Sequence, residues 1–160
     1  MSGLPLPEES PALADEYAAA REREGSVMAI LRAMGPRAEL VRAFLALADA
    51  ALYGPAALSR REREVLALAT SQANGAAYSA GIHAALLEEL GADPGARDQA
   101  LIDFARRLTL APREAADAVA DLRAHLSDDE AYDAIAVVGL LNLANRAALA
   151  TGITEADDLR

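Results

Sequence analysis

The chain has 160 residues, of which 53% are hydrophobic but only 4% aromatic, and its formal net charge is −10 at pH 7. This length fits one domain with one core, and a core built mainly from Ala, Leu, Val and Ile favours closely packed helices over a β-sandwich. The negative charge repels a phosphate backbone, so nucleic acid is not an expected partner. The chain contains no cysteine, which excludes disulfides, thiolate metal ligands and thiol nucleophiles.

Two segments bear on export and membranes. The start, MSGLPLPEESP, has neither the basic nor the apolar stretch of a secretory signal, so we expect a cytoplasmic protein. The most apolar stretch, 134–150, is interrupted by Asn142, Asn145 and Arg146, and a charged group at the centre of a lipid-facing helix is costly. We therefore expect a buried helix there and no membrane association.

Glycines and capping residues divide the sequence into helical lengths. Gly25, Gly35, Gly54, Gly91 and Gly152 each follow an apolar-periodic segment, where a left-handed residue can end a helix at little cost. The expected helices cover residues 11–24, 26–34, 36–53, 60–73, 76–90, 94–110, 112–125 and 128–151. Strand signals are almost absent, so the predicted fold class is all-α.

The expected helix starts are also legible. Ser59 with Glu62, and Ser127 with Glu130, have the spacing of a capping box, and the Asp-Pro pair at 93–94 places a proline in a first helical turn. We expect one domain over residues 1–160, a compact bundle of about eight helices, in which residues 1–10 form a flexible arm.

An Asn-Gly pair at 74–75 predicts a break between two helices, with unpaired backbone N–H groups and a positive dipole end near Ala76. At 100° per residue, Ala76, Ser79 and His83 fall within about 60° of one another and share one face of the second helix. Glu64 lies on the preceding helix and would reach that face only across the turn. Together these residues form the candidate site.

Four stretches give the sequence a recognisable pattern. They are LSRREREVLALATSQANG at 58–75, a Tyr-to-His spacing at 78–83, DFARRLTLAP at 103–112 and LLNLANR at 140–146. On these stretches, the chain resembles the alkylhydroperoxidase D-like branch of the carboxymuconolactone decarboxylase family, in particular its peroxidase-related members. The resemblance covers most of the chain and implies an alkylhydroperoxidase D-like helical bundle.

The resemblance also assigns the candidate site. The family pattern has a Glu twelve residues before the first cysteine of a C-x-x-C pair and a His four residues after the second. Glu64, Ala76, Ser79 and His83 occupy these places, so both cysteines are replaced. In the family, the second thiol attacks a hydroperoxide with help from Glu and His, and the first thiol then closes a disulfide, which is an antioxidant activity.

Neither replacement can carry out that cycle. Ala76 cannot resolve an oxidised sulfur, and the Ser79 hydroxyl is far less acidic than a thiol and forms no reversible disulfide. We therefore predict that this chain is inactive as a thiol peroxidase, through natural loss or engineering.

Three other functions remain open. One is a thiol-independent acid–base enzyme of the decarboxylase type, with Glu64 and His83 as the proton-transferring pair. Another is a non-catalytic oligomer that binds a small apolar or acidic molecule beside Ala76. Ser79 and His83 also have the i,i+4 spacing of a nucleophile and its base, although neither a G-x-S-x-G turn nor an evident oxyanion loop accompanies them. Equally, His83 could be a satisfied interior histidine and Glu64 a solvated helix carboxylate.

The remaining polar residues suggest a structural role. Asn142, Asn145 and Arg146 form a polar stripe on an apolar helix and should belong to a network, either tying that helix to a neighbour or lining the pocket. Arg146 could pair with Glu64 or with a bound carboxylate. Tyr78 supplies bulk for packing or for an interface, with a phenolic hydrogen bond as a second option.

The two histidines and the apolar final helix bear on cofactors and partners. Only His83 and His125 could serve as imidazole ligands, and they are far apart in sequence, so we expect no metal and no other cofactor. A long apolar final helix leaves more hydrophobic surface than a monomer covers, which predicts a homo-oligomer. The resemblance implies dimers that assemble further into trimers or hexamers, with the site near a subunit boundary.

Overall fold

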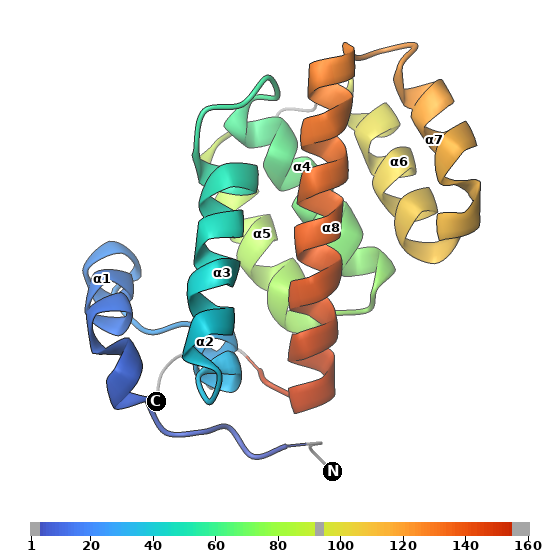
Figure 1. Cartoon of the computed structure of the whole chain (residues 1–160). Helices are drawn as coiled ribbons and strands as arrows, with labels where there is room; N and C mark the ends of the chain where they lie inside the picture. The colour runs from blue at the N-terminus through green and yellow to red at the C-terminus, as the bar shows by residue number, and fades with distance from the viewer. Residues whose placement is uncertain (1–3, 92–94, 155–160) are drawn as a thin grey trace.

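In a computed structural model, residues 4–91 and 95–154 are described, and they form helices joined by short turns, with no strand among them (Figure 1). The α-helices are α1 (Ala14–Glu24), α2 (Ala29–Met34), α3 (Ala38–Ala48), α4 (Arg60–Ala73), α5 (Ala77–Glu89), α6 (Asp98–Leu110), α7 (Ala115–Leu122) and α8 (Asp128–Thr151). Short 3-10 turns precede α1 and α7, and a π-helical segment, η2 (Asp49–Tyr53), extends α3. The predicted all-α fold is confirmed.

Both capping boxes are present. The Ser59 hydroxyl accepts the backbone N–H of Glu62 at 3.3 Å, and the Ser127 hydroxyl accepts that of Glu130 at 3.3 Å. Arg97 joins the two boxes, because its guanidinium donates to the Glu62 and the Glu130 carboxylates, at 2.6 Å each. These local signals explain why α4 and α8 begin where the sequence predicted.

All five glycines follow the end of a helical segment, but only three of them have the expected left-handed conformation. Gly25, Gly91 and Gly152 have positive φ angles of 78°, 107° and 70° at helix ends. Gly35 is instead right-handed, with φ −54°, and Gly54 is extended, with φ −71°. The proposed start at residues 93–94 lies outside the described residues.

The two exceptions are glycines because of close packing. A Cβ on Gly35 would lie 2.6 Å from the Tyr17 hydroxyl oxygen, and a Cβ on Gly54 would lie 2.8 Å from the carbonyl oxygen of Asp49. A side chain is therefore excluded at both places by neighbouring atoms, which a pattern of helix stops cannot reveal.

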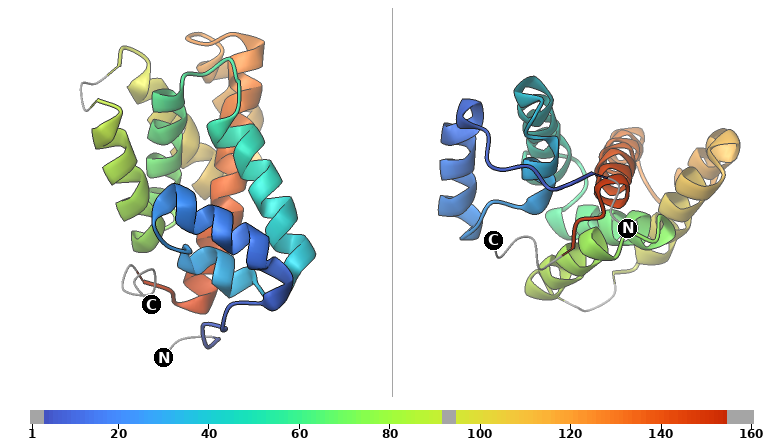
Figure 2. Two further views of the ribbon diagram at one scale, coloured as in Figure 1. Left: turned by 90° about the vertical axis from the view of Figure 1, so that its left-hand side faces the viewer. Right: turned by 90° about the horizontal axis from the view of Figure 1, so that it is seen from below.

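Helix α4 lies at the centre of the bundle and packs against α5, α6 and α8. Leu66, Ala67, Thr70 and Ser71 on α4 are completely buried. The view from below in Figure 2 places α1 and α7 at opposite edges, with α8 between them. The central position of α4 brings its side chains within reach of α5 on one side and α8 on another.

Helix α8 could cross a membrane by length and composition alone. In the bundle it packs along α4, and its residues Ala134, Val137 and Val138 are completely buried. Asn145 is also completely buried and makes hydrogen bonds inside the protein. Helix α8 is therefore a core helix of the bundle, as its interrupted apolar pattern predicted.

Candidate functional site

The candidate site is built on the hairpin formed by α4 and α5. Helix α4 ends at Ala73, the chain turns through Gly75 with φ +67°, and α5 begins at Ala77. Ala76 is the N-cap of α5, and no side chain caps this end. The first-turn N–H groups of α5 have no acceptor within the helix, so this end carries a partial positive charge.

Glu64 and His83 form a buried pair across the hairpin. The Glu64 Oε2 lies 2.7 Å from the His83 Nδ1, and the exposed fractions of the two residues are 0% and 8%. An ionised carboxylate can only accept, so Nδ1 carries the hydrogen and Nε2 is left as the basic nitrogen of the neutral ring. The carboxylate thus fixes both the tautomer and the orientation of the imidazole.

Arg60 completes this group from the other side. Its guanidinium pairs with the second oxygen of the Glu64 carboxylate and lies 4.8 Å from the centre of the Tyr53 ring. Burial by itself would raise the pKa of the Glu64 carboxyl, but the hydrogen bonds from His83 and Arg60 and the positive charge of Arg60 outweigh burial and lower the pKa. Glu64 is therefore ionised at neutral pH although it is buried.

This arrangement predicts an acid-stability effect for Arg60→Met. A carboxyl whose folded-state pKa is lowered stabilises the fold above its unfolded pKa, and that contribution is lost as pH falls through the folded pKa. Without Arg60, the pKa of Glu64 rises, so the acid-unfolding midpoint should move to higher pH in circular dichroism titrations. Arg113→Met, at an exposed position before α7, is the control and should keep the wild-type midpoint. Equal midpoints for Arg60→Met and wild type would contradict the assigned pairing.

His83 and Ser79 line a cavity of about 70 Å³, which we call the site cavity. Its walls come from α2, α3, η2, α5 and α8 and are mostly apolar. Among the described residues that line it, Asp49 and His83 are the only ones with ionisable acid or imidazole groups, and none is an arginine. Asp49 and Tyr53 are exposed, so they mark its mouth.

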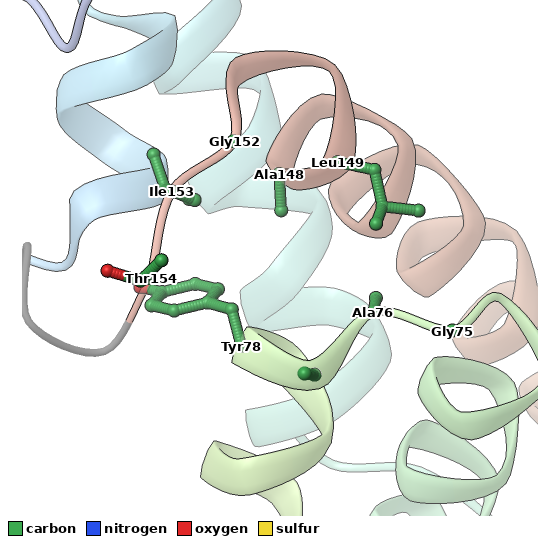
Figure 3. Close-up of a pocket in the computed structure, with 9 residues that line it drawn as sticks. Gly75, Ala76, Tyr78, Ala148, Leu149, Gly152, Ile153 and Thr154 are labelled. Carbon is green, nitrogen blue, oxygen red and sulfur yellow. The ribbon is translucent and has the colours of Figure 1, made fainter. Parts of the chain in front are cut away.

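Ala76 faces a different hollow. This second, more open hollow of about 430 Å³ lies between the start of α5 and the end of α8, where Ala76 is opposite Ala148 and Leu149 (Figure 3). Tyr78 lines both spaces and is 6% exposed. The structure therefore brings Ser79 and His83 to one cavity and places Ala76 at another.

The polar stripe of α8 joins a network with α4. The side-chain amide of Asn145 and the hydroxyl of Ser71 are joined by hydrogen bonds of 3.3 Å. The Asn74 side chain donates to the Asn142 side chain at 3.0 Å. Arg146 donates to the same Asn142 oxygen at 2.6 Å. Neither Asn142 nor Asn145 lines the site cavity. The network ties α8 to α4, which is the first of the two roles expected from the sequence.

Sequence reasoning missed Arg60, Tyr53 and Asp49. Arg60, rather than Arg146, pairs with Glu64, and its i,i+4 spacing on α4 was the signal that could have found it. Tyr53 and Asp49 come from a segment distant in sequence and carried no such signal. No group of three or more metal-ligating side chains occurs in the described part of the chain.

Comparison with known proteins agrees with this fold. A sequence profile of the carboxymuconolactone decarboxylase family matches residues 38–121, over half of the chain, and the chain belongs to this family. Searching curated protein sequences gave no match.

Three solved structures match the fold over nearly the whole chain. An uncharacterized peroxidase-related protein from Silicibacter sp. TM1040 is 27% identical, with a TM-score of 0.84 over 96% of this chain and 91% of that one. A peroxidase-related protein with an alkylhydroperoxidase AhpD core, from Ralstonia eutropha JMP134, is 27% identical, with a TM-score of 0.82 over 99% and 95%. A cysteine-to-alanine variant of the debrominase Bmp8, in complex with 2,3,4-tribromopyrrole, is 19% identical, with a TM-score of 0.77 over 99% and 95%, and shares the fold.

Proposed function

We propose that this chain is a thiol-independent member of the family, whose Glu64–His83 pair transfers protons to and from a small uncharged organic molecule in the site cavity. The observation that carries the proposal is the buried 2.7 Å contact between the pair, with His83 lining the cavity. Because Nδ1 is held by the carboxylate, Nε2 is the ring nitrogen that remains for a ligand. Thiol-dependent peroxide reduction is not part of the proposal, since the chain has no cysteine.

The lining supports an uncharged ligand. A carboxylate ligand entering the cavity would find no arginine among the described lining residues, and it would pass the acidic Asp49 at the mouth. Burying an unpaired charge costs far more than burying a neutral carbonyl group. Of the apolar and acidic ligands considered from the sequence, the cavity favours the apolar class.

Acetone in D₂O tests the proposal directly. A general base next to a bound ketone should exchange the methyl protons for deuterium, which ¹H NMR follows as loss of the methyl signal. We expect exchange above the buffer rate with acetone, and at most the buffer rate with pyruvate, which adds a carboxylate to the same methyl ketone. Exchange of acetone at the buffer rate would contradict the proton-transfer function.

The hollow beside Ala76 supports a second candidate, binding without turnover. It is larger than the site cavity and lined by small and apolar residues. A ligand that binds only the folded chain raises its melting temperature, by an amount that grows with the logarithm of ligand concentration above Kd. Stabilisation by phenol, without acetone exchange, would favour this binding function over catalysis.

An exposed apolar face on α8 supports a homo-oligomer. Tyr132, Ile135, Leu143 and Leu149 on this helix are 72%, 39%, 44% and 50% exposed, and an apolar surface of this kind is typical of an interface. We expect Leu143→Glu to dissociate the assembly to single chains in light scattering, because the carboxylate would be buried unpaired. Ala116→Glu, exposed on α7, is the control and should keep the wild-type mass. A monomeric wild type, or an unchanged mass for Leu143→Glu, would contradict this assembly.

A further inference from the structure

Ser79 is a buried residue whose hydroxyl has no hydrogen-bond partner in the described part of the chain. It is 6% exposed and lines the site cavity with His83. Ser71, the other buried serine in the described part of the chain, donates to a backbone carbonyl one turn earlier. The hydroxyl oxygen of Ser79 remains accessible, so it can meet a ligand in the cavity that it shares with His83.

The helix places the hydroxyl and the imidazole in the order that a nucleophile and its base require. Side chains on a helix lean toward its N-terminus, so the His83 ring leans over the turn that carries Ser79. Glu64 holds Nδ1 of that ring at 2.7 Å and leaves Nε2 as the acceptor for a hydroxyl proton. Ser79 and His83 are not hydrogen-bonded to each other in the structure, and such contacts often tighten only when substrate binds.

The start of α5 supplies the electrophilic part of the site. Ser79 lies in the first turn of this 13-residue helix, whose end no side chain caps. The positive dipole end of the helix stabilises negative charge that develops on a carbonyl oxygen nearby.

From these observations we infer that Ser79, His83 and Glu64 form a catalytic triad that hydrolyses short, uncharged acyl esters. The inference rests on the proposed Glu64–His83 pair and names its substrate class. Ser79 Oγ bonds to the ester carbonyl carbon as its proton passes to His83 Nε2. The carbon–oxygen bond to the alcohol then breaks, and the alcohol leaves with that proton. Water repeats the sequence on the acyl-serine and releases the carboxylic acid, while Glu64 stabilises the imidazolium.

The size of the site cavity limits the acyl group. A cavity of roughly 150 Å³ holds benzene, whereas this one measures about 70 Å³. An acetyl group fits, with the leaving group at the mouth formed by Asp49 and Tyr53, and a long acyl chain does not. Acetyl esters should therefore be hydrolysed at least tenfold faster than octanoyl esters.

The test uses p-nitrophenyl acetate with the full-length protein. We expect a burst of about one nitrophenolate per site, a mass increase of one acetyl group, and that group on the Ser79 peptide in mass spectrometry. The chain has neither lysine nor cysteine, which removes the commonest competing nucleophiles. Ser79→Ala should lose the burst and the adduct, whereas Ser10→Ala, outside the site, should keep both.

The possible outcomes are separable. Acetylation at another residue, or an undiminished burst in Ser79→Ala, would overturn the triad. If acetone exchange is present in the wild-type protein but no acetyl-serine forms, the triad is wrong and the proton-transfer function stands. If neither is observed, both are wrong. A nitrophenolate burst whose rate falls at least tenfold in Glu64→Gln would support the complete triad.

Discussion

Glu64→Gln is expected to reduce the enzyme-dependent exchange of acetone by about 10²- to 10⁴-fold, the range typical of general acid–base catalysis. Glutamine has nearly the same shape as glutamate but no charge, so it cannot stabilise an imidazolium. Its amide can also donate as well as accept, so it no longer requires the hydrogen to be on Nδ1 of His83. The 2.7 Å contact with His83 would remain sterically possible while its electrostatic basis is removed.

The tautomer of His83 gives a second readout that does not depend on turnover. In the wild-type protein, ¹⁵N chemical shifts should show Nδ1 protonated on His83, and Glu64→Gln should mix the two tautomers. His125 is exposed and serves as an internal reference, since the chain has only two histidines.

Asp98→Asn is the matched control for charge. Asp98 pairs with Arg61 at 2.9 Å, and its carboxyl does not line the site cavity. This variant removes one carboxylate, as Glu64→Gln does, and should keep wild-type exchange. Unchanged exchange in Glu64→Gln would remove the pair from the mechanism, and loss in both variants would point to a general effect of charge.

The double substitution Ala76→Cys and Ser79→Cys is expected to create peroxide-dependent thiol oxidation where the wild-type chain has none. The two positions are three residues apart at the uncapped start of α5, where a thiolate is stabilised. The Glu64–His83 pair is already in place to accept the thiol proton. One equivalent of tert-butyl hydroperoxide should therefore produce an internal disulfide, seen as loss of both free thiols in mass spectrometry.

The single variants are the controls for this experiment. Ser79→Cys alone has no resolving thiol and should stop at oxidised sulfur, and Ala76→Cys alone faces the other hollow, away from the pair. A folded double variant that keeps both thiols after peroxide treatment would show that the family mechanism needs more than these four positions.

Local chemistry explains which parts of the fold were predictable. Helix α4 has a capping box at Ser59 and a breaker at Gly75, so both of its ends are determined within a few residues of sequence. The Glu64–His83 contact followed from family spacing and from the hairpin. The right-handed conformation of Gly35 was not predicted, because the neighbour that requires a glycine there is Tyr17, which is close in space but distant in sequence.

The site cavity was not predictable for the same reason. Its mouth comes from η2, a π-helical segment that the sequence suggested would be the end of an ordinary helix. The helical-wheel argument placed Ala76 on one face with Ser79, yet the cap residue at the start of a helix lacks helical geometry, with φ −88° and ψ 83° at Ala76. Periodicity holds only inside the helix, so it could not assign Ala76 to its hollow.

Arg97 gives the starts of α4 and α8 a shared counterion. Its guanidinium holds the carboxylates of both capping boxes, and their hydrogen bonds raise its own pKa, first through Glu130 and also through Glu62. Loss of either carboxylate changes the field acting on the other, so the free energies of the two caps are coupled and do not add. The helix that carries Glu64 therefore begins at a cap whose stability depends on the cap of α8, the longest helix.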